Sequence, residues 1–285
     1  MDAHQFKNWL ACYQRGDANS PLIMGIANVT PDSFSDGCVN QTTPQMVEKI
    51  MAMISDGADV IDIGGESTRP GARPVSLDDE LKRVIPLIQC LRQETNICIS
   101  VDTYKSEVMK AALDAGADMI NDVNGLRCPK ALDVVLSYQV PVCVMHMQGT
   151  PLTMQEKVCE DDDMVGLIEQ FFQQQVYRFL NKGIKLENII LDPGIGFGKS
   201  FQQNINIIHH LDQFLTHKCP LLLGVSRKSM IGYALNRPVN ERLYGSLTLS
   251  VLGFLNGAKI FRTHDVLATK DAITMADIVN NLKSH

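Results

Sequence analysis

Short apolar runs alternate with longer segments of helical periodicity along most of the chain. Each run is rich in Val, Ile and Leu, and we find eight of them, each followed by a longer segment. The predicted strands cover residues 22–29, 60–65, 98–103, 119–123, 141–147, 188–193, 221–226 and 259–264. A near-continuous apolar run is typical of a strand that is buried on both faces. Strands that alternate with helices favour a parallel sheet.

The segments between these runs carry apolar residues at helical spacing, and several end in glycine, which is common just past a helix. Clear examples cover 78–94, 106–116, 168–183 and 245–257. Eight strand–helix units in 285 residues fit an α/β fold of the closed (β/α)8 TIM barrel type. We predict a single domain over residues 1–285, with residues 1–18 forming a helix outside the barrel. An open doubly wound sheet is the alternative.

Composition narrows the classes of function. The chain is 45% hydrophobic and 20% charged, which is typical of a soluble globular protein, and its net charge of −6 gives no support for a nucleic-acid partner. No apolar run is long enough to cross a membrane, and the N-terminus does not resemble a signal peptide. The eight cysteines are scattered without a C-x-x-C pair, which favours reduced thiols. We therefore expect a cytoplasmic protein, in which local clusters of basic residues could still bind small anionic ligands.

A glycine-rich stretch, "LDPGIGFGKS" at 191–200, resembles two nucleotide-binding motifs but matches neither. A Walker A loop needs a glycine where Pro193 stands, and the third glycine of G-x-G-x-x-G would fall on Lys199. Asp192, at the end of a predicted strand, is therefore the better candidate for chemistry.

Polar side chains gather where the predicted strands end. In a barrel these ends meet at one mouth, where active sites of this fold lie. Strands three, four and six contribute acids and an amide, from Asp102, Asn121 and Asp192. Strands one, two and eight contribute amide and cationic groups, from Asn28, Arg69, Arg262 and His264, and Lys228 lies between the two sets. A pterin diphosphate matches this layout, because its ring offers paired N–H donors to a buried carboxylate and its tail offers anionic oxygens.

A series of motifs carries a resemblance to a known family. They run in order from residue 25 to 265: "GIANVTPDSFSDG", "IGGESTRPGA", "SVDTYK", "IND", "MHMQGTP", "LDPGIGFGK", "GVSRKSMIG" and "RTHD". Together they resemble the signature blocks of the dihydropteroate synthase family. The resemblance implies a TIM-barrel transferase of folate synthesis, which joins 6-hydroxymethyl-7,8-dihydropterin diphosphate to p-aminobenzoate and releases diphosphate. It also implies a homodimer, Mg²⁺ at the diphosphate, and inhibition by sulfonamides that mimic p-aminobenzoate.

The resemblance also implies roles for individual residues. For the pterin it indicates Asp102, Asn121, Met145, Asp192, Gly224 and Lys228. For the diphosphate it indicates Asn28, Thr68, Arg262 and His264, with Asn28 also reaching the metal. For p-aminobenzoate it indicates Thr68, Arg69, Pro70, Phe197, Lys228 and Ser229. The residues expected to be catalytic are Asp102, Asp192, Lys228 and Asp36, the last as an acid on a lid.

The chemistry agrees with these residue types. Loss of diphosphate leaves positive charge on the pterin methylene, which fixed carboxylates stabilise as it forms. An arylamine is already neutral at pH 7, so the nucleophile needs no strong base. Other functions stay open: a pterin module that transfers methyl groups, a metal-dependent hydrolase using His146 and His264 with Asp102 or Asp192, and a scaffold that associates through residues 245–258.

Overall fold

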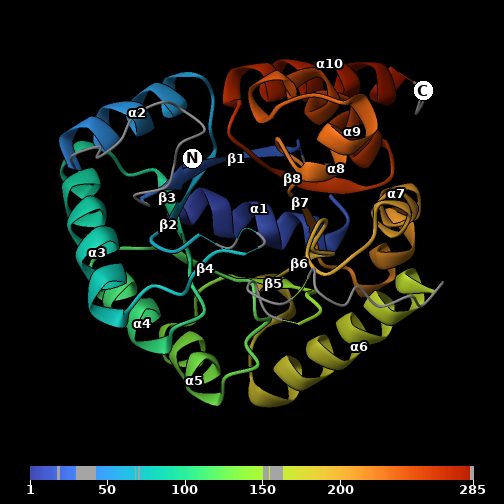
Figure 1. The fold of residues 1–285 in the computed structure, drawn as a ribbon. Coiled ribbons are helices and arrows are strands. Elements are labelled where there is room, and N and C mark those ends of the chain that lie inside the picture. Colours follow the sequence, from blue (N-terminus) through green and yellow to red (C-terminus); the bar gives the residue numbers. More distant parts are fainter. Residues whose placement is uncertain are drawn as a thin grey trace.

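The computed structural model describes residues 1–17, 20–29, 43–67, 69, 71–149, 154 and 163–282. Eight parallel strands close into a barrel in chain order, with β8 returning to pair with β1 (Figure 1). Helices surround the barrel on its outside (Figure 1). This confirms the predicted (β/α)8 barrel and excludes the open doubly wound sheet.

The strands coincide with the predicted apolar runs, although most end one or two residues earlier. They are β1 (Leu22–Asn28), β2 (Val60–Gly64), β3 (Cys98–Asp102), β4 (Met119–Asp122), β5 (Val142–Met145), β6 (Ile189–Asp192), β7 (Leu221–Leu223) and β8 (Ala258–Thr263). Strand β7 falls short of the predicted 226 because the chain turns there: Lys228 N–H donates to the carbonyl of Val225, and Arg227 is left-handed, with φ +57°.

The helices pack an apolar face on the strands and fill the layer between them. They are α1 (Ala3–Arg15), α2 (Thr43–Ser55), α3 (Leu77–Glu94), α4 (Ser106–Asp114), α5 (Pro129–Tyr138), α6 (Met164–Lys182), α7 (Phe201–His209), α8 (Ser229–Leu235), α9 (Leu243–Leu255) and α10 (Val266–Asn281). Short 3-10 helices cover Leu186–Asn188, Leu211–His217 and Val239–Glu241.

Helix α1 closes the end of the barrel at which the strands begin. Its buried Phe6 and Leu10 pack against the first inward side chains of the strands, such as Leu22, Val60 and Cys98. Asp2 caps the helix, since its side chain accepts from Gln5 N–H in a capping box. Apolar side chains therefore fill this end of the barrel in the described part of the chain, and the end at which the strands finish is the candidate for ligand binding. Among the described residues, no helix combines the length and hydrophobicity needed to cross a membrane.

Candidate active site

Strand register brings the predicted polar residues to one level of the barrel. Asn28 pairs with Gly64, Gly64 with Asp102, and Asp102 with Asn121, so four neighbouring strands present one layer. Asp192 pairs with Met145 on the next two strands. Asp102, Asn121 and Asp192 are each less than 10% exposed. Acid and amide groups from strands far apart in sequence therefore share one buried floor, as predicted.

Arg262 lies at the centre of this floor. Its Nε donates to Asp62 Oδ2 at 2.6 Å, and a terminal nitrogen donates to Asp102 Oδ2 at 2.9 Å. Asn121 Nδ2 donates to the same oxygen of Asp62 at 3.1 Å. The fully buried Asp62 was missed in the sequence analysis, which considered only the ends of strands. The feature of the sequence that could have identified Asp62 is that it is an acid within an otherwise apolar run.

Burial controls the electrostatics of the acids. It raises the pKa of Asp102 to about 7, although the nearby Arg262 guanidinium opposes the rise and Asp62 adds to it. Burial also raises the pKa of Asp192, against the lowering effects of Lys228 and of the hydrogen bond from Gly194 N–H. These carboxylates therefore gain from any ligand that brings hydrogen-bond donors or positive charge.

The glycine-rich stretch after β6 is a turn that presents Asp192. Gly194 N–H donates to Asp192 Oδ1 at 2.7 Å. Lys199 is buried beneath the turn, and its Nζ donates to the carbonyl oxygens of His146, Gly194 and Phe197 at 3.1, 2.8 and 3.1 Å. Burial lowers the pKa of Lys199 to about 7. The lysine that resembles a phosphate-loop residue instead ties this turn to the end of β5.

Lys228 and Phe197 face each other beside the floor. Lys228 Nζ lies 4.5 Å from the centre of the Phe197 ring and donates to the carbonyl of Ile195. Burial lowers the pKa of Lys228 to about 8, although Asp192 opposes the change. The next residue, Ser229, is exposed and begins α8. A cation and an aromatic ring therefore border the acids on the side of β6 and β7.

Met145 forms an apolar wall. It belongs to a buried cluster with Val123, Met147 and Met154, against which Tyr104 and Phe197 pack. A flat ring above Asp192 would contact this wall on one face. Gly224 leaves open space beside its backbone, since a Cβ there would have only Arg262 Cβ within 4 Å, at 3.9 Å.

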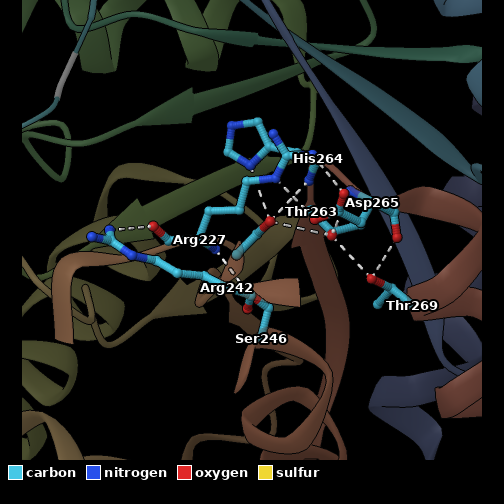
Figure 2. Close-up of polar contacts among 8 residues, drawn as sticks. Arg227, Arg242, Ser246, Thr263, His264, Asp265 and Thr269 are labelled. Carbon is cyan, nitrogen blue, oxygen red and sulfur yellow. Dashed lines mark hydrogen bonds and ion pairs between the residues drawn. The ribbon is translucent and has the colours of Figure 1, made fainter. Parts of the chain in front are cut away.

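His264 lies at the cationic edge. Its Nδ1 is 3.0 Å from Ser226 Oγ, within the polar network shown in Figure 2. Burial, together with the positive charges of Arg262, Arg227 and Arg69, lowers the pKa of His264 to about 3. The ring is therefore neutral near pH 7. Three of the residues predicted for the mouth, Asp36, Thr68 and Pro70, lie outside the described part of the chain, so their roles remain predictions.

The hydrolase alternative finds no support in the geometry. In the part of the chain that the structure describes, no group of three or more His, Cys, Asp or Glu side chains could hold a metal ion. His146 packs edge-on against Phe171 at 5.1 Å, and burial lowers its pKa to about 3. Asp122, next to Asn121, accepts from Asn124 and Leu126 N–H and so stabilises its own turn.

Comparison with known proteins gives the chain its relatives. The model of the pterin binding enzyme family matches residues 24–264. Dihydropteroate synthase of Escherichia coli K12 is 44% identical over 269 residues, which cover 94% of this chain and 95% of that protein. The structure of Yersinia pestis dihydropteroate synthase with a sulfonamide drug has a TM-score of 0.88 at 43% identity, covering 92% of this chain and 95% of that one. Xanthomonas albilineans dihydropteroate synthase with 4-aminobenzoic acid has a TM-score of 0.85 at 44% identity, covering 92% and 93%. The chain thus belongs to the pterin-binding enzymes and, within them, to the dihydropteroate synthase family.

Proposed function

We propose that this protein is a transferase of folate biosynthesis that condenses 6-hydroxymethyl-7,8-dihydropterin diphosphate with p-aminobenzoate to give 7,8-dihydropteroate and diphosphate. The observation that carries the proposal is the shared mouth, in which buried acids lie beside Arg262 and Lys228. In this reaction the methylene C–O bond breaks as diphosphate leaves with the bonding electrons. The amine nitrogen forms the new C–N bond and then loses a proton.

The floor suits a pterin ring because some of the carboxylate oxygens of the floor have no hydrogen-bond donor within the protein that the structure describes. Asp62 Oδ1 and Asp102 Oδ1 are buried and have no hydrogen-bond partner in the described part of the protein. Such groups are costly to leave unpaired. The ring N–H and amino groups of a pterin are donors of the required kind, with Asp192 and Asn121 as the primary partners and Met145 against the ring face. The same carboxylates stabilise positive charge on the methylene as the C–O bond breaks.

The diphosphate belongs on the side of Asn28, Arg262 and His264. Mg²⁺ fits this side because it prefers oxygen ligands, keeps several waters, and often binds through one or two protein groups together with substrate phosphates. Asn28 offers an amide oxygen, and Gly64 leaves it room: a Cβ at Gly64 would lie 3.3 Å from Asn28 Oδ1. When bound, the ion would neutralise charge on the leaving group.

p-Aminobenzoate belongs between Phe197 and the segment after β2. Lys228 offers charge to its carboxylate and Ser229 a hydroxyl, while Arg69 is exposed at the same mouth. Thr68 and Pro70 are further expected contacts. A sulfonamide would compete for this position, consistent with the drug in the Yersinia pestis structure.

The proposal extends to assembly and location. Helices α8, α9 and α10 lie together on one side of the barrel (Figure 1) and expose large apolar side chains, among them Tyr233, Tyr244, Leu255, Met275 and Ile278. We assign this face to a homodimer. Ser250 and Gly253 of α9 are not part of it, because both are buried. Ile278→Glu should lower the mass measured by light scattering, whereas Tyr177→Glu, on exposed α6, should not.

A cytoplasmic location agrees with the free thiols of all six described cysteines.

Formation of dihydropteroate from the two substrates, with and without Mg²⁺, tests the function directly. Asp192→Asn should abolish turnover and pterin binding. Asp122→Asn is the matched control, because Asp122 is also buried and, among the described residues, accepts hydrogen bonds only within its own turn. The Asp122→Asn variant should be less stable than the wild type but should bind the pterin with unchanged affinity. Near-normal pterin affinity in Asp192→Asn would contradict the assignment. Diphosphate release that does not depend on p-aminobenzoate would favour a different pterin enzyme.

A further inference from the structure

Ser226 and His264 form a buried contact whose hydrogen positions can be worked out from their neighbours. Ser226 Oγ lies 3.0 Å from His264 Nδ1 and accepts from the backbone N–H of His264 at 3.1 Å. Thr263 Oγ1 is the next hydroxyl, at 3.5 Å from Ser226 Oγ. Which ring nitrogen of His264 carries the proton therefore depends on where the single hydroxyl hydrogen of Ser226 points.

The neighbouring threonines use their hydrogens elsewhere. Thr269 donates to the carbonyl of Asp265 at 2.7 Å, so its hydrogen is committed. Thr263 Oγ1 lies 3.0 Å from Thr269 Oγ1 and accepts from Asp265 N–H at 3.1 Å (Figure 2). Because Thr269 has no second hydrogen, Thr263 must be the donor between them. Thr263 then has no hydrogen left for Ser226.

Distance settles the direction of the Ser226 hydrogen. O–H donors reach their acceptors at about 2.5–3.0 Å, so Thr263 at 3.5 Å is a poor target. His264 Nδ1 at 3.0 Å is the acceptor within normal reach. If Nδ1 itself carried the hydrogen, the buried hydroxyl of Ser226 would point at no acceptor within that range among the described residues. Ser226 therefore donates, Nδ1 is bare, and the proton of the neutral ring sits on Nε2.

The turn that holds Ser226 is firmly fixed. Arg227 takes the left-handed conformation, with φ +57°, and pairs with Asp265 through two nitrogens at 3.1 and 2.6 Å. Its N–H donates to Ser246 Oγ at 2.9 Å, and its carbonyl accepts from Arg242 at 3.1 Å (Figure 2). A non-glycine residue in this conformation persists only where surrounding contacts hold it. The hydroxyl of Ser226 is thus oriented before any ligand arrives.

We propose that Ser226 is a positioning residue that fixes His264 as the neutral Nε2–H tautomer and so presents a ready hydrogen-bond donor to the leaving diphosphate. His264 Nε2 is buried without a partner in the described structure, two residues after Arg262 on the same side of the chain. A lone pair on Nε2 would face the anionic oxygens unfavourably, whereas N–H donates to them with no need to take up a proton. The role of the diphosphate rests on the proposed function; the tautomer does not.

Side-chain ¹⁵N NMR of the free, histidine-labelled wild-type protein at pH 7 tests the tautomer without any substrate. His264→Gln identifies the resonance by its disappearance. The expected signature is a protonated Nε2 and a bare Nδ1, and in Ser226→Ala this preference should weaken. A protonated Nδ1, or an imidazolium, in the wild type would overturn the proposal even if the protein forms dihydropteroate normally.

Kinetics test the consequence for substrate binding. Ser226→Ala should raise KM for the pterin diphosphate about tenfold, the size of one hydrogen bond, and leave KM for p-aminobenzoate unchanged. Ser250→Ala, which removes another buried hydroxyl that bonds to a helix carbonyl, should change neither. His264→Gln keeps a neutral N–H donor near the position of Nε2, so it should retain more affinity for the pterin diphosphate than His264→Asn. Equal losses for Gln and Asn, or equal KM changes for both substrates in Ser226→Ala, would refute the assignment.

Discussion

Gly194 tests whether the turn after β6 exists to present Asp192. The residue is left-handed, with φ +68°, and a Cβ there would lie 1.9 Å from the carbonyl oxygen of His146. Real Cβ atoms essentially never approach closer than 3.0 Å, so Gly194→Ala must push the turn away by about 1 Å or more. The obstacle is backbone at the end of β5, which cannot rotate aside as a side chain could.

The cost follows from the bonds that such a shift breaks. Gly194 N–H donates to Asp192 Oδ1 at 2.7 Å, and the carbonyl of Gly194 accepts from Lys199 Nζ at 2.8 Å. Hydrogen bonds to charged groups contribute roughly 1.5–3 kcal/mol each, and a left-handed alanine adds about 1 kcal/mol. Gly194→Ala should therefore lower the free energy of unfolding by about 4–7 kcal/mol. It should also weaken pterin binding, because Asp192 loses the contact that orients it.

Gly183→Ala provides the matched control. Gly183 is also left-handed, with φ +94°, but its Cβ would meet nothing within 4 Å. Only the conformational cost of about 1 kcal/mol remains there. Urea unfolding gives the stabilities, and calorimetric titration with a pterin gives the affinities. Equal destabilisation by the two substitutions, or unchanged pterin affinity in Gly194→Ala, would refute the reasoning.

Three other predictions concern the buried charges. For Lys199→Met we expect a change in the pH dependence of stability. In the folded protein burial lowers the pKa of Lys199 to about 7, whereas the pKa of an unfolded lysine is 10.5, so the cost of burying the charge is complete below pH 7 and falls as the pH rises from 7 to 10.5. Urea unfolding should therefore show that the stability of the wild type rises relative to the variant across that window. Asp62→Asn should cost about 3 kcal/mol, and combining it with Arg262→Met should cost less than the two single changes added together; additive losses in the double-mutant cycle would contradict the ion pair. Lys105 pairs with the buried Glu66 and Glu80, and Glu66 begins the segment after β2 that is proposed to contact p-aminobenzoate. Lys105→Met should therefore raise KM for p-aminobenzoate as well as lower stability. Arg92→Met, which breaks the pair with Asp118 at the far end of the barrel, should lower stability alone. A KM that responds equally to both changes would show a general effect of instability.

The fold and much of the floor could be predicted from the sequence because barrel geometry is regular. Strands buried on both faces read as apolar runs, and in a closed barrel their last residues must converge. Asp102, Asn121 and Asp192 were found in this way, and the structure brings them together. The predicted end of β7 was wrong because nothing in "LLLGVS" reveals the left-handed turn at Arg227, which depends on contacts with Asp265.

Asp62 and Lys199 could not be assigned from sequence because their roles depend on distant partners. Asp62 sits in the middle of β2, and its function is apparent only when Arg262, 200 residues later, reaches across the barrel to it. Lys199 occupies the place of a phosphate-loop lysine, yet it points down to three carbonyls. Local pattern identifies which side chains are unusual, but only the closed barrel shows which of them meet.

The position of Arg262 links the two halves of the mouth. Its guanidinium neutralises Asp62 and Asp102, and an uncompensated buried charge would be costly. On the proposed function, diphosphate competes for the same cation as the C–O bond breaks and its charge grows. As Arg262 interacts more strongly with the leaving group, it neutralises the two carboxylates less. The carboxylates then stabilise positive charge on the pterin methylene more strongly. Stabilisation that grows along the reaction in this way lowers the barrier more than it tightens substrate binding. It requires that one arginine touch both acids and the anion, which a closed barrel allows because strands β2, β3 and β8 all end at one mouth.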